Sequence, residues 1–432
     1  MPNRRQFLKV AAVVAAGQTL AVNVPRVHAA GNGIIKIGLI GSGGRGLGAA
    51  NQALATGKDV KLVAVGDYFK DRAANGTNAL KKQFSEQVDV PADKIFDGFK
   101  NAQGVIASGA DVILIACAAK FHPIYSLLAL QAGKHVFCEK PNAIDANGLQ
   151  TLTEAVKLAK EKNLCFLSGL MSRFAPQYQQ LFAKIQDGAI GDIKSIHSNY
   201  LRAPYGVRGY PQGMSELDVQ VYNQYMFSWL SGDDFTQSLV HNVDRMTWVL
   251  GGQVPSHAFG MGGRSSMTDR QFGNVFDHHA AAFVYPGDAF HFQAYCRTTT
   301  GCYNNEVDTI IGTKGTAYVG QAKITGENPW HFEGQKLGGH AEEQVALFNA
   351  IRKGERLHSD DYIVKSTQLA ILGQVAAYTG RVVGWDEMYN SNFAFKPLPE
   401  ECFADAPVQP PIVPDPKTGS YPVPIPGQVK FW

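Results

Sequence analysis

The sequence has few cysteines and lacks the spacings that mark metal or redox sites. None of its six cysteines belongs to a Cys-x-x-Cys pair, so a zinc ribbon or a dithiol centre is not indicated. No internal repeat is visible along the 432 residues, which argues against solenoids and propellers. The apolar stretch Val10–Val24 is interrupted by Gly17-Gln18-Thr19 and is short for a bilayer-spanning helix. We therefore expect a globular protein with no stable membrane span after processing.

The chain also lacks a large excess of charge of either sign. Its formal net charge is +3, and the first 30 residues hold four cations and no acids. Removing those four positive charges takes the formal net charge from +3 to −1. This balance predicts neither a nucleic-acid partner nor binding to a charged membrane surface. The four cations are Arg4, Arg5, Lys9 and Arg26.

What the sequence does contain begins with a leader over residues 1–30. Arg4 and Arg5 are followed by Gln-Phe-Leu-Lys, an apolar stretch and Val27-His28-Ala29, a small-residue cleavage pattern. This arrangement resembles a twin-arginine (Tat) signal, except that Asn3 stands where Ser or Thr is usual. We expect export by this route, to the periplasm or otherwise out of the cytoplasm. An ordinary secretory signal and an uncleaved anchor are the alternatives.

A short apolar run, Ile34–Ile40, leads into a glycine-rich turn and then into Ala-rich sequence of helical character. Strand, turn and helix in this order are the context in which G-x-G-x-x-G binds a dinucleotide. The first glycine allows a tight turn, the second lets the backbone approach the pyrophosphate, and the third lets helix and strand pack closely. The candidate cofactor-binding residues of this turn are Gly41, Ser42, Gly43, Gly44, Arg45 and Gly46.

An acidic residue follows the turn at the expected distance. Asp67 comes 21 positions after Gly46, at the end of a second apolar run. An acid there binds the ribose hydroxyls of NAD and repels the 2′-phosphate of NADP. We therefore expect NAD, with NADP still possible because Tyr68 and Lys70 follow closely and a basic neighbour can accommodate a phosphate.

Residues 34–170 alternate apolar runs with helical stretches, which predicts an α/β fold with a doubly wound parallel sheet of Rossmann type. The turn after the third of these strands adds Ala118 and His122 as candidate cofactor contacts, because cofactors bind at the carboxyl ends of such strands. The expected strands are Ile35–Ile40, Lys61–Val65, Val112–Ala116, His135–Cys138 and Cys165–Leu170, and the expected helices are Gly46–Thr56, Asp71–Gln83, His122–Ala132 and Asn147–Glu161.

Residues 171–400 change to a pattern of period near two with short connections, which predicts an α+β domain with an open, mainly antiparallel sheet. The expected strands are Ile193–Leu201, Ala258–Gly262, Ala280–Tyr285, Phe290–Cys296, Asp308–Ile311 and Thr316–Gly320, with helices at Gln237–Leu250, Glu342–Arg352 and Asp361–Ala377. Residues 401–432 are expected to form a Pro-rich extended tail, an arm over this domain or over a neighbouring subunit.

Three short motifs give the chain a family resemblance. Glu139-Lys140-Pro141, Phe121-His122-Pro123 and Ser172-Arg173-Phe174-Ala175-Pro176, placed after the glycine turn, resemble the glucose–fructose oxidoreductase / inositol dehydrogenase / MocA (Gfo/Idh/MocA) family. The resemblance runs from about Ile34 to about Trp385. It implies that Glu139 and Lys140 lie beside the nicotinamide, that Lys140 touches the reacting hydroxyl, and that subunits pair as dimers or tetramers through the second sheet.

The resemblance also points to His241 as the proton-transfer group. In much of the family a helix here carries Asp, then His four residues later, then a second Asp; this chain has Gln237, His241 and Asp244. Histidine suits this task because its ordinary pKa is near neutrality. Since Gln237 cannot hold a charge beside the imidazole, we expect Asp244 to orient the ring. Gln237 and Tyr222 are candidate substrate contacts.

Two further sites remain less determined by the sequence. Arg173 follows the last Rossmann strand and reaches either the substrate or the cofactor carboxamide, or else forms a structural salt bridge. Asp277-His278-His279 looks metal-like, but adjacent side chains of a strand point to opposite faces. No metal site is therefore expected.

The function expected from these residues is NAD(P)-dependent oxidation of a sugar or polyol hydroxyl, with the cofactor tightly bound. The alternative is a glycoside hydrolase that uses NAD in a redox-neutral cycle of oxidation, elimination and hydride return. A non-enzymatic sugar or dinucleotide sensor is a third possibility on the same fold. The presence of both Lys140 and His241 argues against the sensor.

Overall fold

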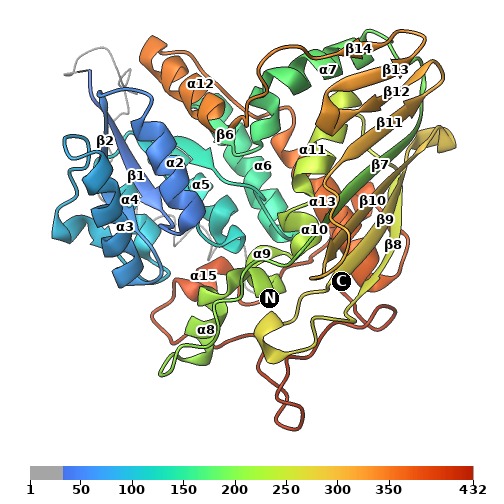
Figure 1. Cartoon of the computed structure of the whole chain (residues 1–432). Helices are drawn as coiled ribbons and strands as arrows, with labels where there is room; N and C mark the ends of the chain where they lie inside the picture. Colours follow the sequence, from blue (N-terminus) through green and yellow to red (C-terminus); the bar gives the residue numbers. More distant parts are fainter. Residues whose placement is uncertain (1–32, 432) are drawn as a thin grey trace.

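The computed structural model describes residues 33–431, which form two sheets with helices packed around and between them (Figure 1). The first sheet has six parallel strands in the order β3-β2-β1-β4-β5-β6. This is the Rossmann order: strands β1 to β3 are added toward one edge of the sheet, and strands β4 to β6 are added toward the other edge, starting beside β1. The strands are β1 Ile35–Ile40, β2 Val60–Gly66, β3 Ile95–Phe96, β4 Val112–Ile115, β5 His135–Cys138 and β6 Phe166–Ser168.

Helices cover both faces of this sheet, which explains why its strands are near-continuous apolar runs. α2 and α3 share a buried cluster with alternate residues of β1, and α4, α5 and α6 cover the opposite face. These helices are α2 Gly44–Leu54, α3 Lys70–Gln83, α4 Asn101–Ile106, α5 His122–Gln131 and α6 Ala146–Glu161. The predicted doubly wound parallel sheet is confirmed, and the prediction missed the two-residue strand β3.

The second sheet has nine strands in the described chain, in the order β14-β13-β12-β11-β7-β10-β9-β8-β15. β7 and β10 pair in parallel and every other neighbouring pair is antiparallel, so the predicted mainly antiparallel sheet is confirmed. The strands are β7 Ile193–Arg202, β8 His257–Gly263, β9 His278–Val284, β10 His291–Thr298, β11 Asp308–Gly312, β12 Gly315–Tyr318, β13 Lys323–Gly326, β14 Trp330–His331 and β15 Val383–Gly384.

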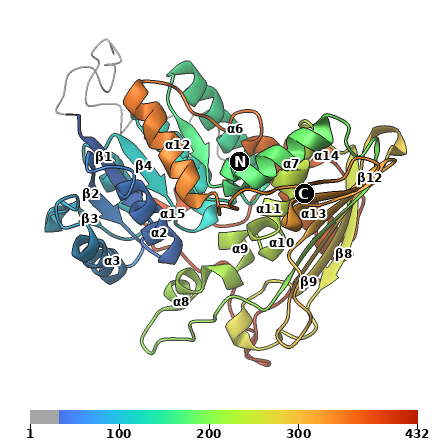
Figure 2. The ribbon, with the colours of Figure 1, turned by 45° about the horizontal axis from the view of Figure 1, so that its top comes forward.

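Helices pack on one face of this second sheet and leave the other face uncovered (Figures 1 and 2). Ile196, Phe292 and Ala294 point inward and are fully buried, whereas Phe259 and Met261 on β8 are exposed. The helices of this half are α7 Pro176–Gln186, α8 Glu216–Tyr222, α9 Ser228–Ser231, α10 Asp234–Gln237, α11 Val240–Val249, α12 His340–Lys353, α13 Ile363–Thr379, α14 Trp385–Asn390 and α15 Pro399–Cys402. Within residues 33–431, no helix combines the length and apolar character needed to cross a bilayer.

The helix predicted over Gln237–Leu250 is present as α11, Val240–Val249, and begins three residues later than predicted. α10 ends at Gln237 and α11 begins at Val240. Between them, the Ser238 hydroxyl bonds the side chains of Asp234 (2.6 Å) and Gln237 (2.7 Å). Serine side chains that bond locally compete with regular helix geometry. Gln237 and His241 therefore do not share one helical face.

α12 leaves the second half of the chain and packs on α2 of the first half. Leu347, Phe348 and Ile351 of α12 are buried in the same cluster as Ile37 and Leu39 of β1. The Rossmann core is thus completed by residues from the last quarter of the chain.

The C-terminal tail, residues 403–431, lies against its own chain. Tyr421 is buried, donates a hydrogen bond to Glu216 at the start of α8, and packs edge-on against Phe227 with ring centroids 5.0 Å apart. The carbonyl of Ile412 accepts a 2.6 Å bond from Gln220 of α8. The tail therefore packs against α8 and is hydrogen-bonded to two of its residues, Glu216 and Gln220.

Candidate functional site

The glycine turn after β1 has the geometry of an anion-binding cradle. Gly41 has φ +88°, and a Cβ on Gly46 would lie 1.8 Å from the carbonyl oxygen of Gly41, so only glycine fits both positions. A Cβ on Gly43 or Gly44 would meet nothing within 4 Å, and both residues line a pocket. α2 begins at Gly44 with no side-chain cap, which leaves its first N–H groups for a ligand phosphate.

Asp67 is fixed at the end of β2 by the glycine turn itself. Its carboxylate accepts hydrogen bonds from the Ser42 N–H (2.8 Å), the Ser42 hydroxyl (3.1 Å) and the Phe69 N–H (3.0 Å). Arg72 Nη1 lies 3.6 Å from the same carboxylate. Ser42, a predicted cofactor contact, is buried and holds Asp67, whereas Gly43, Arg45 and Asp67 line the pocket.

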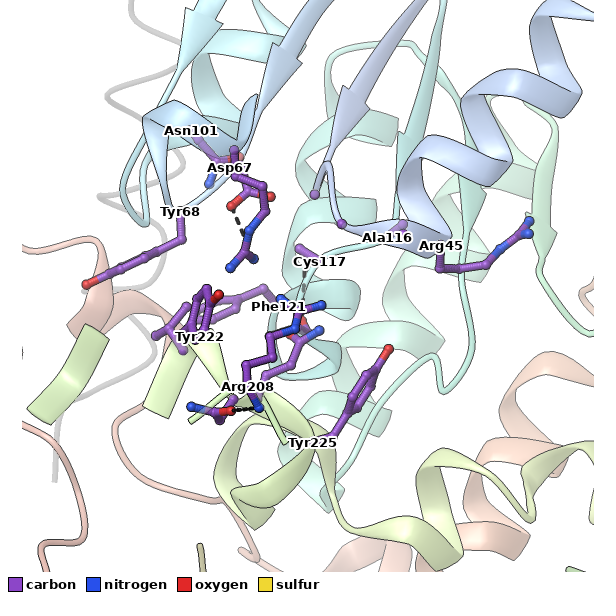
Figure 3. Close-up of a pocket in the computed structure, with 18 of the residues that line it drawn as sticks. Arg45, Asp67, Tyr68, Asn101, Ala116, Cys117, Phe121, Arg208, Tyr222 and Tyr225 are labelled. Carbon is purple, nitrogen blue, oxygen red and sulfur yellow. Dashed lines mark hydrogen bonds and ion pairs between the residues drawn. The ribbon is translucent and has the colours of Figure 1, made fainter. Parts of the chain in front are cut away.

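The pocket at the turn is closed from the other side by residues 206–226, which we call the covering segment. Its empty volume, including the open mouth, is about 880 Å³, within the range of ligand sites. Ala118, Cys117 and Phe121 line the sheet side. Figure 3 shows Arg208, Tyr222 and Tyr225 of the covering segment opposite Asp67, Cys117 and Phe121.

Tyr222, predicted as a substrate contact, lines this pocket near Asp67 and does not line the pocket around Lys140. The guanidinium groups of Arg72 and Arg208 each lie 5.4 Å from the centre of its ring. Arg72 Nη2 is buried without a hydrogen-bond partner among the described residues, and burial lowers the pKa of Arg72. The basic neighbour of Asp67 is thus Arg72, while Lys70 is exposed.

A second pocket continues the first toward Lys140. The two share the lining residues Arg45, Ala116, Cys117, Gln224 and Tyr225, so they form one groove. The Lys140 end adds Glu139, His122, Ser231 and Gln237. The groove therefore joins Asp67, the acid predicted to bind the ribose, to Lys140, the predicted catalytic lysine.

Lys140 is held across the junction between the two halves of the chain. It follows β5, and the Lys140–Pro141 peptide bond is cis. Its Nζ donates a 2.9 Å hydrogen bond to the main-chain carbonyl of Gln237. The Gln237 side chain bonds Ser238 instead. Gln237 thus contributes both to the lining and to the placement of the lysine.

Glu139 and His122 line this pocket but are already engaged within the protein. The Glu139 carboxylate is buried and pairs with Arg45 at 2.5 Å. His122 Nδ1 lies 2.8 Å from the Pro141 carbonyl and Nε2 lies 3.1 Å from the Cys117 carbonyl. His122 therefore links the turns after β4 and β5, and burial lowers its pKa.

His241 is the second residue of α11, and it is partly buried near Lys140. Burial, followed by the positive charges of Lys140 and Arg245, holds the pKa of His241 well below its ordinary value of 6.5. The imidazole is therefore neutral near pH 7, the state that accepts a proton. Its Nδ1 is buried and has no hydrogen-bond partner among the described residues.

Asp244 does not orient His241, which corrects the prediction. Its buried carboxylate accepts bonds from Arg173 Nη2 (2.8 Å) and Nε (3.0 Å) and from the Ser366 hydroxyl (2.8 Å). The Arg173 guanidinium also stacks 3.6 Å from the centre of the Tyr362 ring. For Arg173, predicted either to contact a ligand or to form a structural salt bridge, the structure shows a salt bridge with the buried carboxylate of Asp244.

His340 belongs to this site and was missed by the sequence interpretation. It is the first residue of α12, and a ring nitrogen of His340 lies within 4.8 Å of a carboxylate oxygen of Glu139. No local motif marks it, because α12 reaches the site only through long-range packing on α2. The metal-like pair behaves as expected for a strand, with His278 partly exposed and His279 buried against Asp233.

Comparison with known proteins finds a family model that resembles the Rossmann part of the chain. Residues 35–170 match the sequence model of the Gfo/Idh/MocA group, an oxidoreductase family with an NAD-binding Rossmann fold. An inositol 2-dehydrogenase of Pseudomonas savastanoi pv. phaseolicola is 29% identical over 201 residues, 46% of this chain and 56% of the relative. An inositol 2-dehydrogenase/D-chiro-inositol 3-dehydrogenase of Shouchella clausii is 28% identical over 204 residues, 46% and 54% of the two chains. The chain thus matches a little over half the length of these relatives.

Solved structures share the fold over both halves. The myo-inositol 2-dehydrogenase of Lactobacillus plantarum superposes with a TM-score of 0.61 at 20% identity, covering 81% of this chain and 99% of that one. The scyllo-inositol dehydrogenase of Lactobacillus casei, with bound NAD(H) and scyllo-inositol, gives 0.61 at 22% identity, covering 82% and 99%. The two-sheet architecture is therefore that of these dehydrogenases.

Proposed function

We propose that this chain, whose residues 35–170 form an NAD-binding Rossmann fold of the Gfo/Idh/MocA oxidoreductase family, oxidises a secondary hydroxyl of a polyol or sugar with NAD. One observation carries the proposal. A continuous groove runs from Asp67 past the glycine turn to Lys140, and the positive charge of Lys140 acts on a neutral His241. The inositol dehydrogenases among its relatives support a cyclic polyol as the substrate class.

The residues of the turn fit a dinucleotide. The uncapped start of α2 and the open space at Gly43 and Gly44 would receive the pyrophosphate, and Asp67 would receive the adenosine ribose. NAD, when bound, supplies the hydride acceptor. Arg72 and Tyr222 would flank the adenosine end.

Two side chains supply the proton and charge chemistry. The neutral His241 would accept the hydroxyl proton of the substrate, and the Lys140 ammonium would stabilise the negative charge that develops on the same oxygen. Because Lys140 is anchored on the Gln237 carbonyl, its position is set before substrate arrives. Hydrogen bonds that exist beforehand need no reorganisation during the reaction.

The test is a panel of cyclic polyols and free sugars offered with NAD, with NADH formation followed by its absorbance. Oxidation of at least one polyol, lost in both Lys140→Met and His241→Ala variants, supports the proposal. Nitrophenyl glycosides offered in parallel, without added NAD, separate the alternative. Release of nitrophenol without net NADH would identify the redox-neutral glycosidase instead.

We also propose that the cofactor stays bound and that residues 1–30 direct export by the twin-arginine route. The covering segment supports retention, because Tyr68 after β2 donates a 2.8 Å bond to Asp218 of α8 and ties that segment over the groove. An exported enzyme meets no pool of free NAD, so regeneration within one cycle follows. Protein purified without added cofactor is expected to carry NAD by mass spectrometry, and a fusion of residues 1–30 to a reporter tests export.

The uncovered face of the second sheet supports a homodimer or tetramer. Its outward side chains include large apolar groups that are 37–72% exposed: Phe259, Met261, Tyr295, Ile311 and Tyr318. Such a patch is typical of an interaction site. Light scattering should give a dimer or larger, and a Met261→Glu/Tyr295→Glu variant should be monomeric. A monomeric wild-type protein would refute the proposed homodimer or tetramer.

A further inference from the structure

A buried acid–base cluster lies beside the substrate end of the groove. One ligand-type atom from each of Glu139, His340 and Glu343 falls within 4.8 Å of the others. His340 is held at the start of α12 by a tight turn, since Gly339 has φ +89° and a Cβ there would lie 2.1 Å from the Met171 carbonyl oxygen. Arg45 of α2 reaches into the same cluster.

Glu343 determines how His340 is protonated. Its side chain is fully buried; Oε1 lies 3.3 Å from His340 Nδ1 and 3.8 Å from Arg45 Nη2. Oε2 has no hydrogen-bond partner among the described residues. Burial, then the charge of Glu139, raises the pKa of Glu343 well above its ordinary value. Oε1 also faces the Arg45 guanidinium, which can only donate, so we assign Oε1 as the acceptor and His340 Nδ1 as the donor of their contact.

This arrangement leaves the other ring nitrogen of His340 as an acceptor. Burial lowers the pKa of His340 below 6.5, so the ring is neutral and a proton on Nδ1 means none on Nε2. About a third of the side chain (34%) is exposed. The charged and titratable groups that face it are Arg45 from α2, Glu139 and Lys140 after β5, Glu342 and Glu343 from α12, and His241 from α11.

We propose that His340 is a specificity-determining residue of the substrate site, which accepts a hydrogen bond through Nε2 from a hydroxyl next to the one that is oxidised. Glu343 is its positioning residue. This inference rests on the proposed dehydrogenase function and narrows the substrate to vicinal diols. An acceptor nitrogen favours a hydroxyl over a carbonyl or ether oxygen at that position, because neither of those can donate.

The same three side chains do not form a convincing cation site. The Arg45 guanidinium lies 2.5 Å from Glu139 and 3.8 Å from Glu343. A metal ion would sit beside this fixed positive charge, which opposes cation binding. The hydrogen-bonded arrangement satisfies the cluster without an ion.

The first readout is direct and needs no turnover. Protein labelled with ¹⁵N-histidine, with resonances assigned through a His340→Gln variant, should show His340 protonated at Nδ1, and its Nε2 signal should shift when a vicinal polyol is added. Glu343→Gln keeps a carbonyl acceptor and should preserve this tautomer, whereas Glu343→Leu should lose it. A His340 protonated at Nε2 in the wild type would overturn the inference.

The second readout compares a polyol that the enzyme oxidises with its deoxy analogue lacking the neighbouring hydroxyl. In the wild type the polyol should be preferred, and His340→Ala should reduce that preference about tenfold while leaving the deoxy analogue unchanged. His331→Ala, at an exposed histidine of β14, is the control. An unchanged preference would overturn this inference alone; a wild type inactive on all polyols would sink the proposed function as well. Stoichiometric metal that is lost in His340→Ala would also overturn it.

Discussion

The Nζ atom of Lys140 and the main-chain carbonyl oxygen of Gln237 lie 2.9 Å apart and form a hydrogen bond across the two halves of the chain. Lys140 follows the fifth strand of the Rossmann sheet, and Gln237 ends α10 above the second sheet. The bond uses the backbone of Gln237, so the side chain at position 237 can vary without releasing the lysine.

This relationship predicts different results for the two residues. Lys140→Met should lower kcat/KM about 100-fold or more, because the developing alkoxide loses its stabilising charge. Gln237→Ala should cost less than about tenfold, since the carbonyl that holds Lys140 remains. Steady-state kinetics on the same polyol compares them. Equal losses would show that the Gln237 side chain has its own essential role.

The lowered pKa of His241 predicts where activity and stability fall with pH. The base must be neutral, so kcat/KM should stay flat through pH 6.5 and decline only below it, as His241 takes up a proton. Between its ordinary pKa of 6.5 and its lower folded pKa, the unfolded chain binds a proton that the folded chain does not, so His241 also makes stability fall as pH drops. pH–rate profiles of wild type and His241→Asn measure the effect on activity, and urea unfolding of both proteins at several pH values measures the effect on stability. An acidic limb centred above pH 6.5 would contradict the assignment.

Asp244 should behave as a structural residue. Replacing it by Ala leaves the Arg173 guanidinium buried without its carboxylate, which should cost about 3 kcal/mol of unfolding free energy. The Arg173→Met/Asp244→Ala double variant should recover part of that loss, because no uncompensated charge remains. Urea unfolding of Asp244→Ala, Arg173→Met and the double variant gives the coupling free energy between the two side chains. Full stability in Asp244→Ala, with activity abolished, would restore the catalytic role.

Arg72 should decide how well NADP is tolerated. Its unpartnered Nη2 lies beside Asp67, where a 2′-phosphate would meet it. Arg72→Gln should weaken NADP binding about tenfold or more, with a smaller effect on NAD. Lys70→Gln, which removes a charge from the same helix outside this pocket, is the matched control. Calorimetry on protein stripped of cofactor measures both, and equal losses for NAD and NADP would refute the prediction.

The tail should affect cofactor retention through α8. Tyr421→Ala removes a buried ring and its bond to Glu216, which should cost about 3 kcal/mol and speed NAD release, because the covering segment loses its support. Tyr303→Ala, at a tyrosine that is 74% exposed, is the control. Thermal unfolding and the rate of cofactor loss on dilution are the measurements. If Tyr421→Ala is destabilised but releases NAD at the wild-type rate, the tail does not control cofactor retention.

The features that were predicted correctly from the sequence depend on residues that lie close together in the chain. The glycine turn and Asp67 needed no distant partner, because a G-x-G-x-x-G turn fixes its own strand and helix. Asp244 was misassigned because spacing along a helix shows which residues share a face, but not that Arg173, 71 positions away, lies closer. Tyr222 lines the groove and His340 approaches Glu139 only through tertiary packing. The apolar periodicity of residues 237–250 does not show that the helix begins only at Val240.

The packing of α12 on α2 has a consequence for biosynthesis. The face of the Rossmann sheet under α2 stays open until Leu347, Phe348 and Ile351 are available to cover it. During translation, the nucleotide-binding half therefore emerges long before its core can close. We expect residues 33–170 alone to expose apolar surface and bind hydrophobic dyes, and the chain to acquire NAD only after α12 has left the ribosome. A stable, soluble fragment of residues 33–170 that binds NAD would contradict this order of assembly.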